Sequence, residues 1–267
     1  MKPDGVPTLA PRPPDRAPSK GVNERPGCCA VIISHSRNFV LLAPWKCASQ
    51  TCHKRLAPYN ESPYQRFFHF NPALGRVVHQ HVTLADLMAL PEGQMGLRIA
   101  AFVRNPYDRA YSGFLQVQRD AKTQPKVALT PVWVGDLIRA QIAENMARII
   151  AAGYDFDRWI AALPAYEIHE AGRNSSLPLH PACYWTSLPD RQADFIGRVE
   201  TFEEDFTLFC EEVGIDVPAA VNENVSPGQP RVSNGLSRYA WRMSRATLDR
   251  INDLFAVDFD LFGYERL

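Results

Sequence analysis

The chain contains four short segments whose composition is typical of β-strands. They are residues 30–34, 39–43, 97–103 and 194–199. The run at 97–103 is continuously apolar, as expected for a strand of a parallel sheet that is covered on both faces. Polar residues 35–38 separate the first two segments, so these two form either a hairpin or one bent strand.

Segments with helical periodicity alternate with these strands. We expect helices at residues 52–56, 84–90, 106–118, 131–163, 202–213 and 244–255. Local signals mark their ends, because Thr83 suits an N-cap, Pro106 a first turn and Gly214 a C-terminal stop. Residues 76–81 form one further, short extended segment. The alternation predicts a three-layer α/β domain with a central, mainly parallel sheet flanked by helices.

The segment 131–163 carries large apolar residues at the spacing of one helix face. These are Trp133, Leu137, Ile142, Met146, Ile149 and Ile150. We interpret them as core residues, because an apolar stripe at helical spacing more often packs than binds a cofactor. The chain ends in an aromatic segment with Phe259, Phe262 and Tyr264, which we expect to pack onto the sheet.

Residues 1–27 differ in composition from the rest of the chain. They hold seven prolines and almost no large apolar residue. Such a segment buries too little surface to offset its ordering entropy, so we expect a flexible tail. The remaining residues 28–267 are numerous enough to bury a sizeable core, and we expect them to form one domain.

The overall charge argues against two classes of partner. The 267 residues contain 29 Lys plus Arg and 29 Asp plus Glu, so the formal net charge is zero. This balance does not fit a sequence-independent nucleic-acid binder or a membrane-surface protein. No apolar run approaches the roughly 20 residues that span a bilayer, and no signal peptide is visible. The six cysteines lack zinc-site spacing. We therefore expect a soluble protein of the cytoplasm.

One of the predicted strands leads into a loop that suits an anion. Residues 39–43 precede Pro44-Trp45-Lys46-Cys47-Ala48-Ser49-Gln50-Thr51, which consists mostly of small and hydroxyl residues around one lysine. A strand, such a loop and a helix N-terminus direct free N–H groups and the positive end of the helix dipole at one point. On this segment alone, an ordinary turn with a surface lysine remains an alternative.

A second anion-binding segment follows the strand at 97–103. Arg104 lies at the carboxyl end of that strand, where ligands collect in open α/β sheets, and Ser112 lies one or two turns into the next helix. A guanidinium and a hydroxyl that converge there would hold a phosphate monoester. Asp108 and Arg109 lie between them, and the alternative for both is structural, as a helix N-terminal carboxylate and a salt-bridge partner.

Two anion-binding segments on neighbouring strands suggest a nucleotide with two separate phosphates, and the motifs carry a family resemblance. Residues 44–51 (Pro-x-Lys-Cys-Ala-Ser-x-Thr) and 102–112 (Phe-Val-Arg-Asn-Pro-Tyr-Asp-Arg-x-x-Ser) resemble the two nucleotide-binding motifs of sulfotransferases. The match is closest to the carbohydrate-type family 2, which includes the uronyl 2-O- and HNK-1-type enzymes, and it suggests a bacterial member. Residues 194–206 and 258–264 also resemble family segments, so the resemblance covers residues 38–264.

The resemblance implies a P-loop-like fold and the donor 3′-phosphoadenosine-5′-phosphosulfate, with no metal. It places the 5′-phosphosulfate on Lys46 and on the loop residues Cys47, Ala48, Ser49, Gln50 and Thr51. It places the 3′-phosphate on Arg104 and Ser112. Lys46 is also expected to act in catalysis, because its ammonium stabilises the charge that grows on the bridging oxygen in the transition state.

The chain departs from the family pattern at two positions of the first motif. Trp45 stands between the proline and the lysine, which are adjacent in the family, and Gln50 stands where Ser or Thr is usual. Both changes leave the charge and the small-residue loop intact. They therefore affect the expected geometry more than the expected function.

An alcohol acceptor must lose its proton as the sulfuryl group arrives, and a histidine has a suitable pKa for this step. The segment His79-Gln80-His81-Val82 resembles the His-x-His-Val segment of the uronyl 2-O-type enzymes, whose second histidine is the catalytic base. The resemblance therefore implies that His81 is the base, whereas a histidine on a short strand is otherwise more often a packed or surface residue. His79 alternates to the opposite face and would support structure or substrate.

Several other polar residues are weaker candidates for ligand contacts. They are His180, Arg198, Arg238, Arg242, Arg245 and residues 231–235. Arg198 either touches the ligand or pairs with Glu200 or Glu203. The next three arginines share a helical face if the last helix starts early, and there they either meet an anion or form a solvated basic face.

We expect a sulfotransferase that moves the sulfuryl group by in-line displacement to a hydroxyl of a carbohydrate or glycolipid. The alternatives are a P-loop-type nucleotide kinase or NTPase and a non-catalytic nucleotide-binding relative. A P-loop kinase would show Gly-x-x-x-x-Gly-Lys-[Ser/Thr], and the loop here contains no glycine. Acceptor-binding residues are expected in the loops at 57–75, 119–135 and 164–185.

Overall fold

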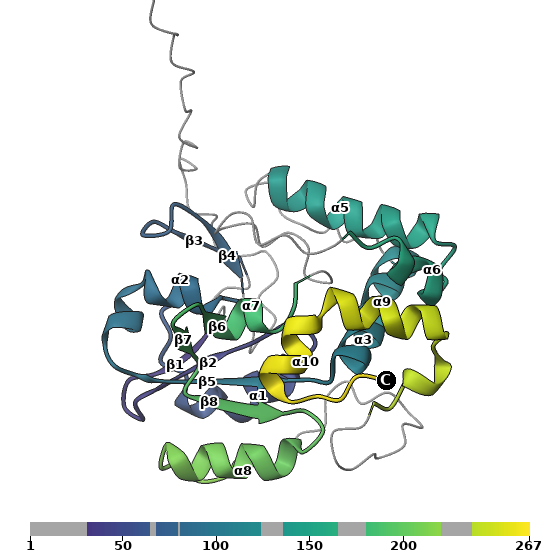
Figure 1. Ribbon diagram of the computed structural model, residues 1–267. Coiled ribbons are helices and arrows are strands. Elements are labelled where there is room, and N and C mark those ends of the chain that lie inside the picture. The colour runs from purple at the N-terminus through teal and green to yellow at the C-terminus, as the bar shows by residue number, and fades with distance from the viewer. Residues whose placement is uncertain (1–30, 65–67, 80, 124–135, 165–179, 220–236) are drawn as a thin grey trace, which may run out of the picture.

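The fold is built on a four-stranded sheet with three parallel strands. The computed structural model of the protein describes residues 31–64, 68–79, 81–123, 136–164, 180–219 and 237–267 (Figure 1). The strands are β1 (Ile32–Ser34), β2 (Phe39–Leu42), β5 (Arg98–Val103) and β8 (Phe195–Arg198), in the order β1-β2-β5-β8. β2, β5 and β8 run parallel, while β1 pairs with β2 in an antiparallel hairpin. All four predicted strands are therefore confirmed, and the first two form a hairpin.

Helices connect and cover these strands. They are α1 (Ser49–Arg55), α2 (Leu84–Met88), α3 (Pro106–Thr123), α5 (Asp136–Ala151), α6 (Phe156–Ala161), α7 (Cys183–Thr186), α8 (Phe202–Glu212), α9 (Arg245–Leu254) and α10 (Ala256–Phe262). The predicted N-cap of α2 is confirmed, because the Thr83 hydroxyl accepts a hydrogen bond from the N–H of Asp86 and the Asp86 side chain caps in return. Gly214 follows α8 with a left-handed φ of 66°, as its helix-stopping role requires.

The sheet is covered on both faces, because alternate residues of its strands point to opposite sides. On one face, apolar strand residues form a cluster with residues of α2, including Val40, Leu42, Ile99, Leu84 and Leu87. On the other face, a second cluster joins strand residues to α1 and α8, including Leu41, Phe102, Cys52, Phe206 and Phe209. In Figure 1, α2 lies above the sheet and α8 below it. The predicted arrangement of a central sheet flanked by helices is confirmed.

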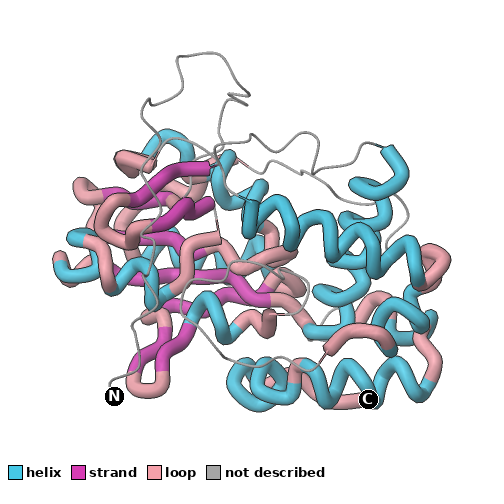
Figure 2. Tube along the Cα trace, turned by 90° about the horizontal axis from the view of Figure 1, so that it is seen from above, coloured by secondary structure: helices cyan, strands magenta, loops and turns pink. Residues whose placement is uncertain are grey.

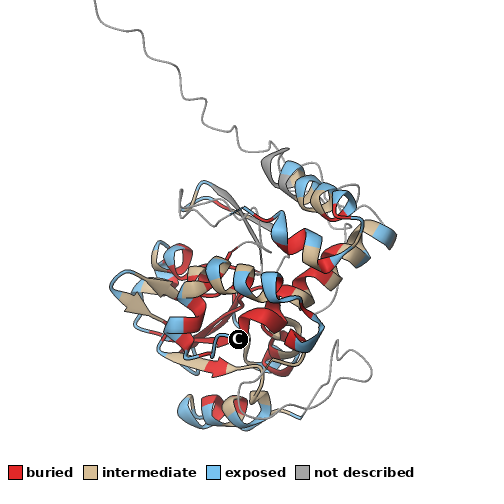
Figure 3. Ribbon diagram, turned by 45° about the vertical axis from the view of Figure 1, so that its right-hand side comes forward, coloured by how far each residue is buried: buried red, intermediate tan, exposed pale blue. Residues whose placement is uncertain are grey.

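A separate group of helices packs beyond the carboxyl ends of the parallel strands. Figure 2 shows the strands on one side of the molecule and this helical group on the other. Its core contains Phe114, Ile149, Trp159, Ile251 and Phe259, from α3, α5, α6, α9 and α10. Figure 3 shows buried residues gathered in the sheet and on the inner faces of these helices.

The predicted helix over residues 131–163 is wrong in its extent. Its described part consists of α5 and α6, which are separated by a turn where Gly153 and Tyr154 have φ of 64° and 58°. Asp155 caps α6 by accepting the N–H of Arg158. The predicted stripe is wrong at Ile150, which is 52% exposed, whereas Ile149 is fully buried. Trp133 lies outside the described residues.

Two further segments differ from the sequence-based expectation. The extended segment at residues 76–81 is the strand β4 (Arg76–His79), and its partner β3 (Phe68–Asn71) was not predicted. A second short hairpin, β6 (Ser187–Leu188) with β7 (Arg191–Gln192), was not predicted either. The aromatic C-terminal segment forms α10, and its Phe259 ring lies 5.1 Å from Tyr107 of α3. The guanidinium of Arg198 in β8 lies over the Tyr264 ring at 5.0 Å, so the segment packs both on α3 and on the end of the sheet.

Other expectations concern features that the described residues show only in part. The predicted tail at residues 1–27 lies outside the described residues. Within the described part, Cys47, Cys52, Cys183 and Cys210 are buried free thiols. No helix among the described residues is both long enough and apolar enough to cross a bilayer.

Candidate functional site

The loop between β2 and α1, residues 43–48, has an unusual backbone. Lys46 and Ala48 both adopt left-handed φ angles, of 67° and 59°, although neither is glycine. This conformation costs an L-residue about 1–2 kcal/mol, and such strain concentrates at functional sites. The N–H of Cys47 donates to the carbonyl of Pro44 at 3.2 Å and closes the turn. Left-handed residues in a tight turn direct backbone N–H groups to one side, which is the geometry of an anion-binding nest.

The charges around this loop favour an anion. Lys46 is half-buried, and its Nζ lies 5.9 Å from the centre of the Trp45 ring. α1 begins at Ser49 and carries no acidic residue in its first turn, while His53, Lys54 and Arg55 occupy its last turn. The positive end of the helix dipole at the loop is therefore not neutralised by a carboxylate of α1.

Cys47 is a packing residue of the loop. Its side chain is buried, and burial raises the pKa of the thiol to about 12 even though Arg109 and Arg104 lie near enough to lower it. A thiol with this pKa stays protonated and is not a nucleophile. Cys47 therefore contributes packing to the loop and no reactive thiolate.

Arg104 occupies the equivalent position after the neighbouring strand β5. Its Nε is buried and forms no hydrogen bond within the described part of the chain. Burial raises the pKa values of the Cys47, Glu200 and Tyr239 side chains. The positive charge of Arg104 lowers each of these pKa values by a smaller amount, so Arg104 lies close to all three groups. A buried donor without a partner is costly unless a ligand satisfies it.

Glu200 shapes the start of the second motif, a role that sequence analysis did not assign to it. Its carboxylate accepts the backbone N–H of Asn105 at 2.9 Å and the hydroxyl of Tyr264 at 3.0 Å. Burial raises the pKa of this carboxyl. The available signal was its position just after β8, at the same sheet edge as Arg104, because the carboxyl ends of parallel strands meet there.

The two predicted anion-binding segments lie side by side. In the parallel pairing of β2 with β5, Leu42 is opposite Ala101, so both strands end at the same edge of the sheet. The Trp45 ring packs against Gly113 of α3 so closely that a Cβ on Gly113 would lie 2.5 Å from it. Ser112 precedes Gly113 and is half-buried. The structure therefore brings Lys46, Arg104 and Ser112 to one region.

Asp108 has a structural role. Its carboxylate accepts hydrogen bonds from the Ser237 hydroxyl at 2.5 Å and from the N–H groups of Arg238 and Tyr239 at 2.9 and 3.2 Å. This contact holds Tyr239 against α3, where its ring centre lies 4.6 Å from that of Tyr111. Asp108 thus anchors the segment beside Arg104, which resolves its two alternatives in favour of structure.

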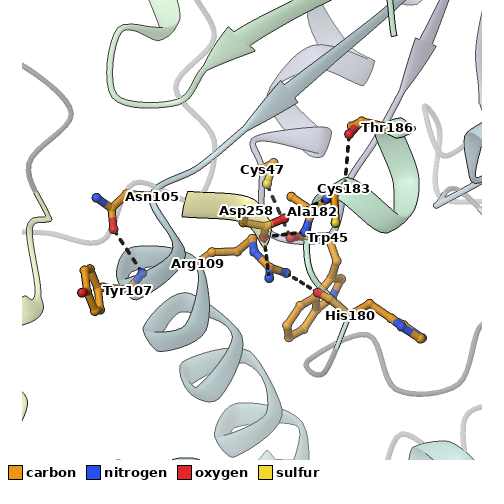
Figure 4. A network of polar contacts seen from close by, with 10 residues as sticks. All are labelled: Trp45, Cys47, Asn105, Tyr107, Arg109, His180, Ala182, Cys183, Thr186 and Asp258. Carbon is orange, nitrogen blue, oxygen red and sulfur yellow. Dashed lines mark hydrogen bonds and ion pairs between the residues drawn. The ribbon is translucent and has the colours of Figure 1, made fainter. Parts of the chain in front are cut away.

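Arg109 is also structural, as part of a buried ion pair (Figure 4). Its Nη2 lies 3.4 Å from Oδ2 of Asp258, and its Nη1 donates to the carbonyl of His180 at 2.8 Å. The Asp258 carboxylate also accepts the N–H groups of Ala182 and Cys183, at 2.6 and 2.9 Å. Both charged side chains are 1% exposed. The pair joins α3 and α10 to the start of α7.

His81 lies at the base of the β2–α1 loop. Its side chain is buried, and its Nδ1 is 2.5 Å from the carbonyl oxygen of Ala43, the first residue of that loop. A carbonyl only accepts, so Nδ1 carries the proton in the neutral ring and Nε2 carries the lone pair. This tautomer suits a general base. The side chain of His79 is not among the described ones.

The weaker candidates have other contacts or fall outside the description. The Arg198 guanidinium donates to the carbonyl of Phe262 at 2.6 Å and lies over the Tyr264 ring at 5.0 Å, which fixes the C-terminal segment. His180 is buried and stacks on Tyr184 at 4.2 Å. Residues 231–235 are outside the described ranges.

The basic residues near α9 do not share a helical face. α9 begins at Arg245 with Ser244 as its N-cap, while residues 240–242 form a separate 3₁₀ turn. Arg242 lies over the Trp241 ring at 4.7 Å, and Arg245 pairs with Asp249 at the surface. The last helix therefore does not start early, and the condition for a common face of Arg238, Arg242 and Arg245 is not met.

Comparison with known proteins identifies the family of the chain. Among the described residues, no group of three or more His, Cys, Asp or Glu side chains could hold a metal ion. Neither the curated proteins nor the solved structures yielded a match. A family model described as the sulfotransferase family matches residues 31–265, which include both anion-binding segments and His81. The chain therefore belongs to the sulfotransferase family, and the protein is a sulfotransferase.

Proposed function

We propose that this enzyme transfers a sulfuryl group from 3′-phosphoadenosine-5′-phosphosulfate to a hydroxyl of a carbohydrate or glycolipid. The observation that carries the donor assignment is the pair of adjacent anion-binding segments. One has a left-handed turn at Lys46 and Ala48, and the other presents Arg104, whose buried Nε has no hydrogen bond within the described part of the chain. The Trp45–Gly113 contact holds the two segments together, as a nucleotide with two separated phosphates requires.

The β2–α1 loop suits the 5′ end of this donor. The left-handed residues direct N–H groups toward an anion, and Lys46 adds a full charge there. When bound, the donor supplies an activated sulfuryl group, and its 5′-phosphate is the leaving group as the new bond forms. Fixed N–H dipoles and the Lys46 ammonium then stabilise the charge that develops on the leaving phosphate. In our proposal Cys47, Ala48, Ser49, Gln50 and Thr51 complete this part of the site.

The second segment suits the 3′-phosphate. A phosphate oxygen accepts hydrogen bonds in the plane of a guanidinium, so Arg104 would satisfy its buried Nε by binding one. Ser112, half-buried on α3, would add a hydroxyl donor. The arrangement of strand, loop and helix at the sheet edge is P-loop-like, although its loop contains no glycine.

His81 is the proposed base of the reaction. Its Nδ1 donates to the carbonyl of Ala43, so in this tautomer Nε2 is the basic nitrogen that would take the proton of an acceptor hydroxyl. The contact also places the His81 ring at Ala43, where the β2–α1 loop begins. Lys46 follows Ala43 by three residues in the same loop. The proposed acceptor class, a sugar hydroxyl, rests on the likeness of residues 79–82 to the uronyl 2-O-type enzymes.

The donor assignment is tested by ligand-induced thermal stabilisation. Adenosine 3′,5′-bisphosphate should raise the melting temperature of the purified protein without magnesium, and it should do so far less in Lys46→Ala. Lys54→Ala removes an exposed lysine of α1 and serves as the control. Stabilisation by Mg-ATP and not by the bisphosphate would instead indicate a kinase.

The acceptor class is tested by transfer of radioactive sulfate. The ³⁵S-labelled donor is incubated with the enzyme and with separate polysaccharide, glycolipid and protein fractions of a cell extract. Label should enter the polysaccharide or glycolipid fraction. Label confined to the protein fraction would contradict the proposed acceptor, and bisphosphate binding without transfer to any fraction would indicate a non-catalytic relative.

A further inference from the structure

A second hydrogen bond, besides the imidazole contact, holds the backbone of His81. The indole Nε1–H of Trp185, in α7, donates to the backbone carbonyl of His81 at 3.2 Å. The Trp185 side chain is fully buried, and its ring lies 6.4 Å from the His81 ring. His81 is thus held at two points, by Trp185 at its carbonyl and by Ala43 at its Nδ1.

Trp185 is in turn fixed by the buried ion pair. α7 has only four residues, so it makes little helical hydrogen bonding of its own. The Asp258 carboxylate compensates by accepting the N–H groups of Ala182 and Cys183 at the start of α7, while Arg109 holds the carbonyl of His180 just before it (Figure 4). The pair thereby sets where α7, and with it Trp185, is placed.

We propose that Trp185 is a positioning residue for the base, and that the Arg109–Asp258 pair holds it in place. The inference rests on the proposed role of His81. Trp185 fixes the backbone of His81, and the imidazole on that backbone donates to the Ala43 carbonyl. This hydrogen bond keeps the proton on Nδ1. The structure therefore links three segments that are distant in sequence, near residues 109, 183 and 258, to the protonation of one imidazole.

The variant Trp185→Phe tests this role with little loss of packing. Phenylalanine keeps an aromatic ring against His81 but lacks the N–H donor. Trp159→Phe is the matched control, because Trp159 is equally buried, lies in α6, and its Nε1 has no hydrogen-bond partner among the described residues. Both variants remove the same atoms from a core, but only Trp185→Phe removes a hydrogen bond to His81.

The first readout requires no acceptor. NMR of the protein labelled with ¹⁵N-histidine distinguishes Nδ1–H from Nε2–H rings, and the signal of His81 is identified by its loss in His81→Gln. We expect the Nδ1–H form in the wild type and in Trp159→Phe, and a mixture of both forms in Trp185→Phe. An unchanged Nδ1–H signal in Trp185→Phe would overturn the positioning role.

The second readout is the rate of ³⁵S transfer to the combined polysaccharide and lipid fraction of a cell extract. Trp185→Phe should lower kcat about tenfold to a hundredfold, because a displaced catalytic group loses that much, while the KM for the donor stays unchanged. In a His81→Ala background, Trp185→Phe should cause no further loss, since it acts through His81. A further loss in that background would contradict the inference.

Failure of the proposed function would show a different pattern. If His81→Ala keeps full activity, the base assignment falls, while the tautomer measurement still decides whether Trp185 positions the ring. If His81→Ala is inactive but Trp185→Phe matches Trp159→Phe in rate and in tautomer, the base assignment stands and the positioning role falls.

Discussion

The Trp45 ring lies directly on the backbone of Gly113, and a Cβ added to Gly113 would approach the indole Cζ3 to 2.5 Å. Trp45 belongs to the β2–α1 loop and Gly113 to α3, immediately after Ser112. The contact therefore sets the spacing between the two anion-binding segments. It also gives a structural reason for Trp45, which departs from the family pattern by separating the proline from the lysine.

Gly113→Ala should weaken donor binding. Alanine is better than glycine in a helix by about 1 kcal/mol, but overpacking a core costs about 1–3 kcal/mol, so we expect a net loss of stability. Relief of the clash moves Trp45 and the adjacent Lys46, so the Kd for adenosine 3′,5′-bisphosphate should rise, as measured by isothermal titration calorimetry. The double variant Trp45→Phe with Gly113→Ala has a smaller ring and should regain affinity. Tighter or equal binding in Gly113→Ala alone would show that the contact does not set the spacing.

Replacing His81 should separate binding from turnover. General-base catalysis contributes about 10²- to 10⁴-fold, so kcat for ³⁵S transfer should fall by about this factor in His81→Ala while bisphosphate affinity stays near that of the wild type. His35→Ala, in the exposed β1–β2 turn, is the control and should leave both unchanged. Undiminished turnover in His81→Ala would reject the base assignment.

Removing Arg104 should lower the preference for a nucleotide with a 3′-phosphate over one without it. A hydrogen bond to a charged group is worth about 1.5–3 kcal/mol, so Arg104→Ala should bind adenosine 3′,5′-bisphosphate about ten- to a hundredfold more weakly. Adenosine 5′-monophosphate, which lacks the 3′-phosphate, should bind equally well to the variant and to the wild type. Arg245→Ala, in an exposed ion pair of α9, is the control. An equal loss for both nucleotides would place Arg104 away from the 3′-phosphate.

Breaking the buried Arg109–Asp258 pair should lower the unfolding free energy more than breaking a surface ion pair. Asp258→Ala leaves a guanidinium buried without its counter-charge, and such changes cost about 3–5 kcal/mol of unfolding free energy. The matched control is Asp260→Ala in the same helix, because Asp260 pairs with Arg266 at the surface and exposed pairs contribute about 1 kcal/mol or less. Urea denaturation of both variants measures the difference. Equal losses of unfolding free energy in the two variants would show that the buried pair stabilises the fold no more than the surface pair does.

The stability of the fold should fall in acid through His53. Burial lowers the pKa of His53 in α1 from 6.5 to about 4. Below about pH 6.5 His53 binds a proton in the unfolded chain, whereas in the folded chain it binds one only near pH 4. Its contribution to stability is therefore fully present above pH 6.5 and is lost as the pH falls toward 4. The variant His53→Leu should lose less unfolding free energy than the wild type between pH 7.5 and pH 4.5 in urea titrations. The same loss in both proteins would exclude His53 as its source.

The local elements of the fold were predictable because their signals act over a few residues. The continuous apolar run of β5 marks a buried parallel strand, Thr83 caps α2, and Pro106 starts α3. The boundary between α5 and α6 also carries local signals, Gly153 in the turn and Asp155 as the N-cap of α6, which the prediction of one helix over 131–163 did not use. α7 has no comparable signal, because it has only four residues and no side-chain N-cap.

The order of the site residues along the chain was also accessible without the structure. Lys46 follows one apolar strand and Arg104 the next, and parallel strands that end at one edge bring such residues together. The roles of Asp108 and Arg109 were not accessible. Each had two alternatives, and only the contacts with residues 237–239 and with Asp258 decided between them.

The amino-acid sequence by itself determined the four strands of the main sheet, the starts of α2 and α3, the glycine-free loop and the arginine that follows β5, because steric preference and side-chain periodicity act between near neighbours. Only the tertiary structure decided that Trp45 packs on Gly113, that Asp258 pairs with Arg109, and that Trp185 holds His81. These contacts join residues 68, 149 and 104 positions apart. Many side chains of the right type exist at such separations, and the choice among them depends on how all the layers pack at once.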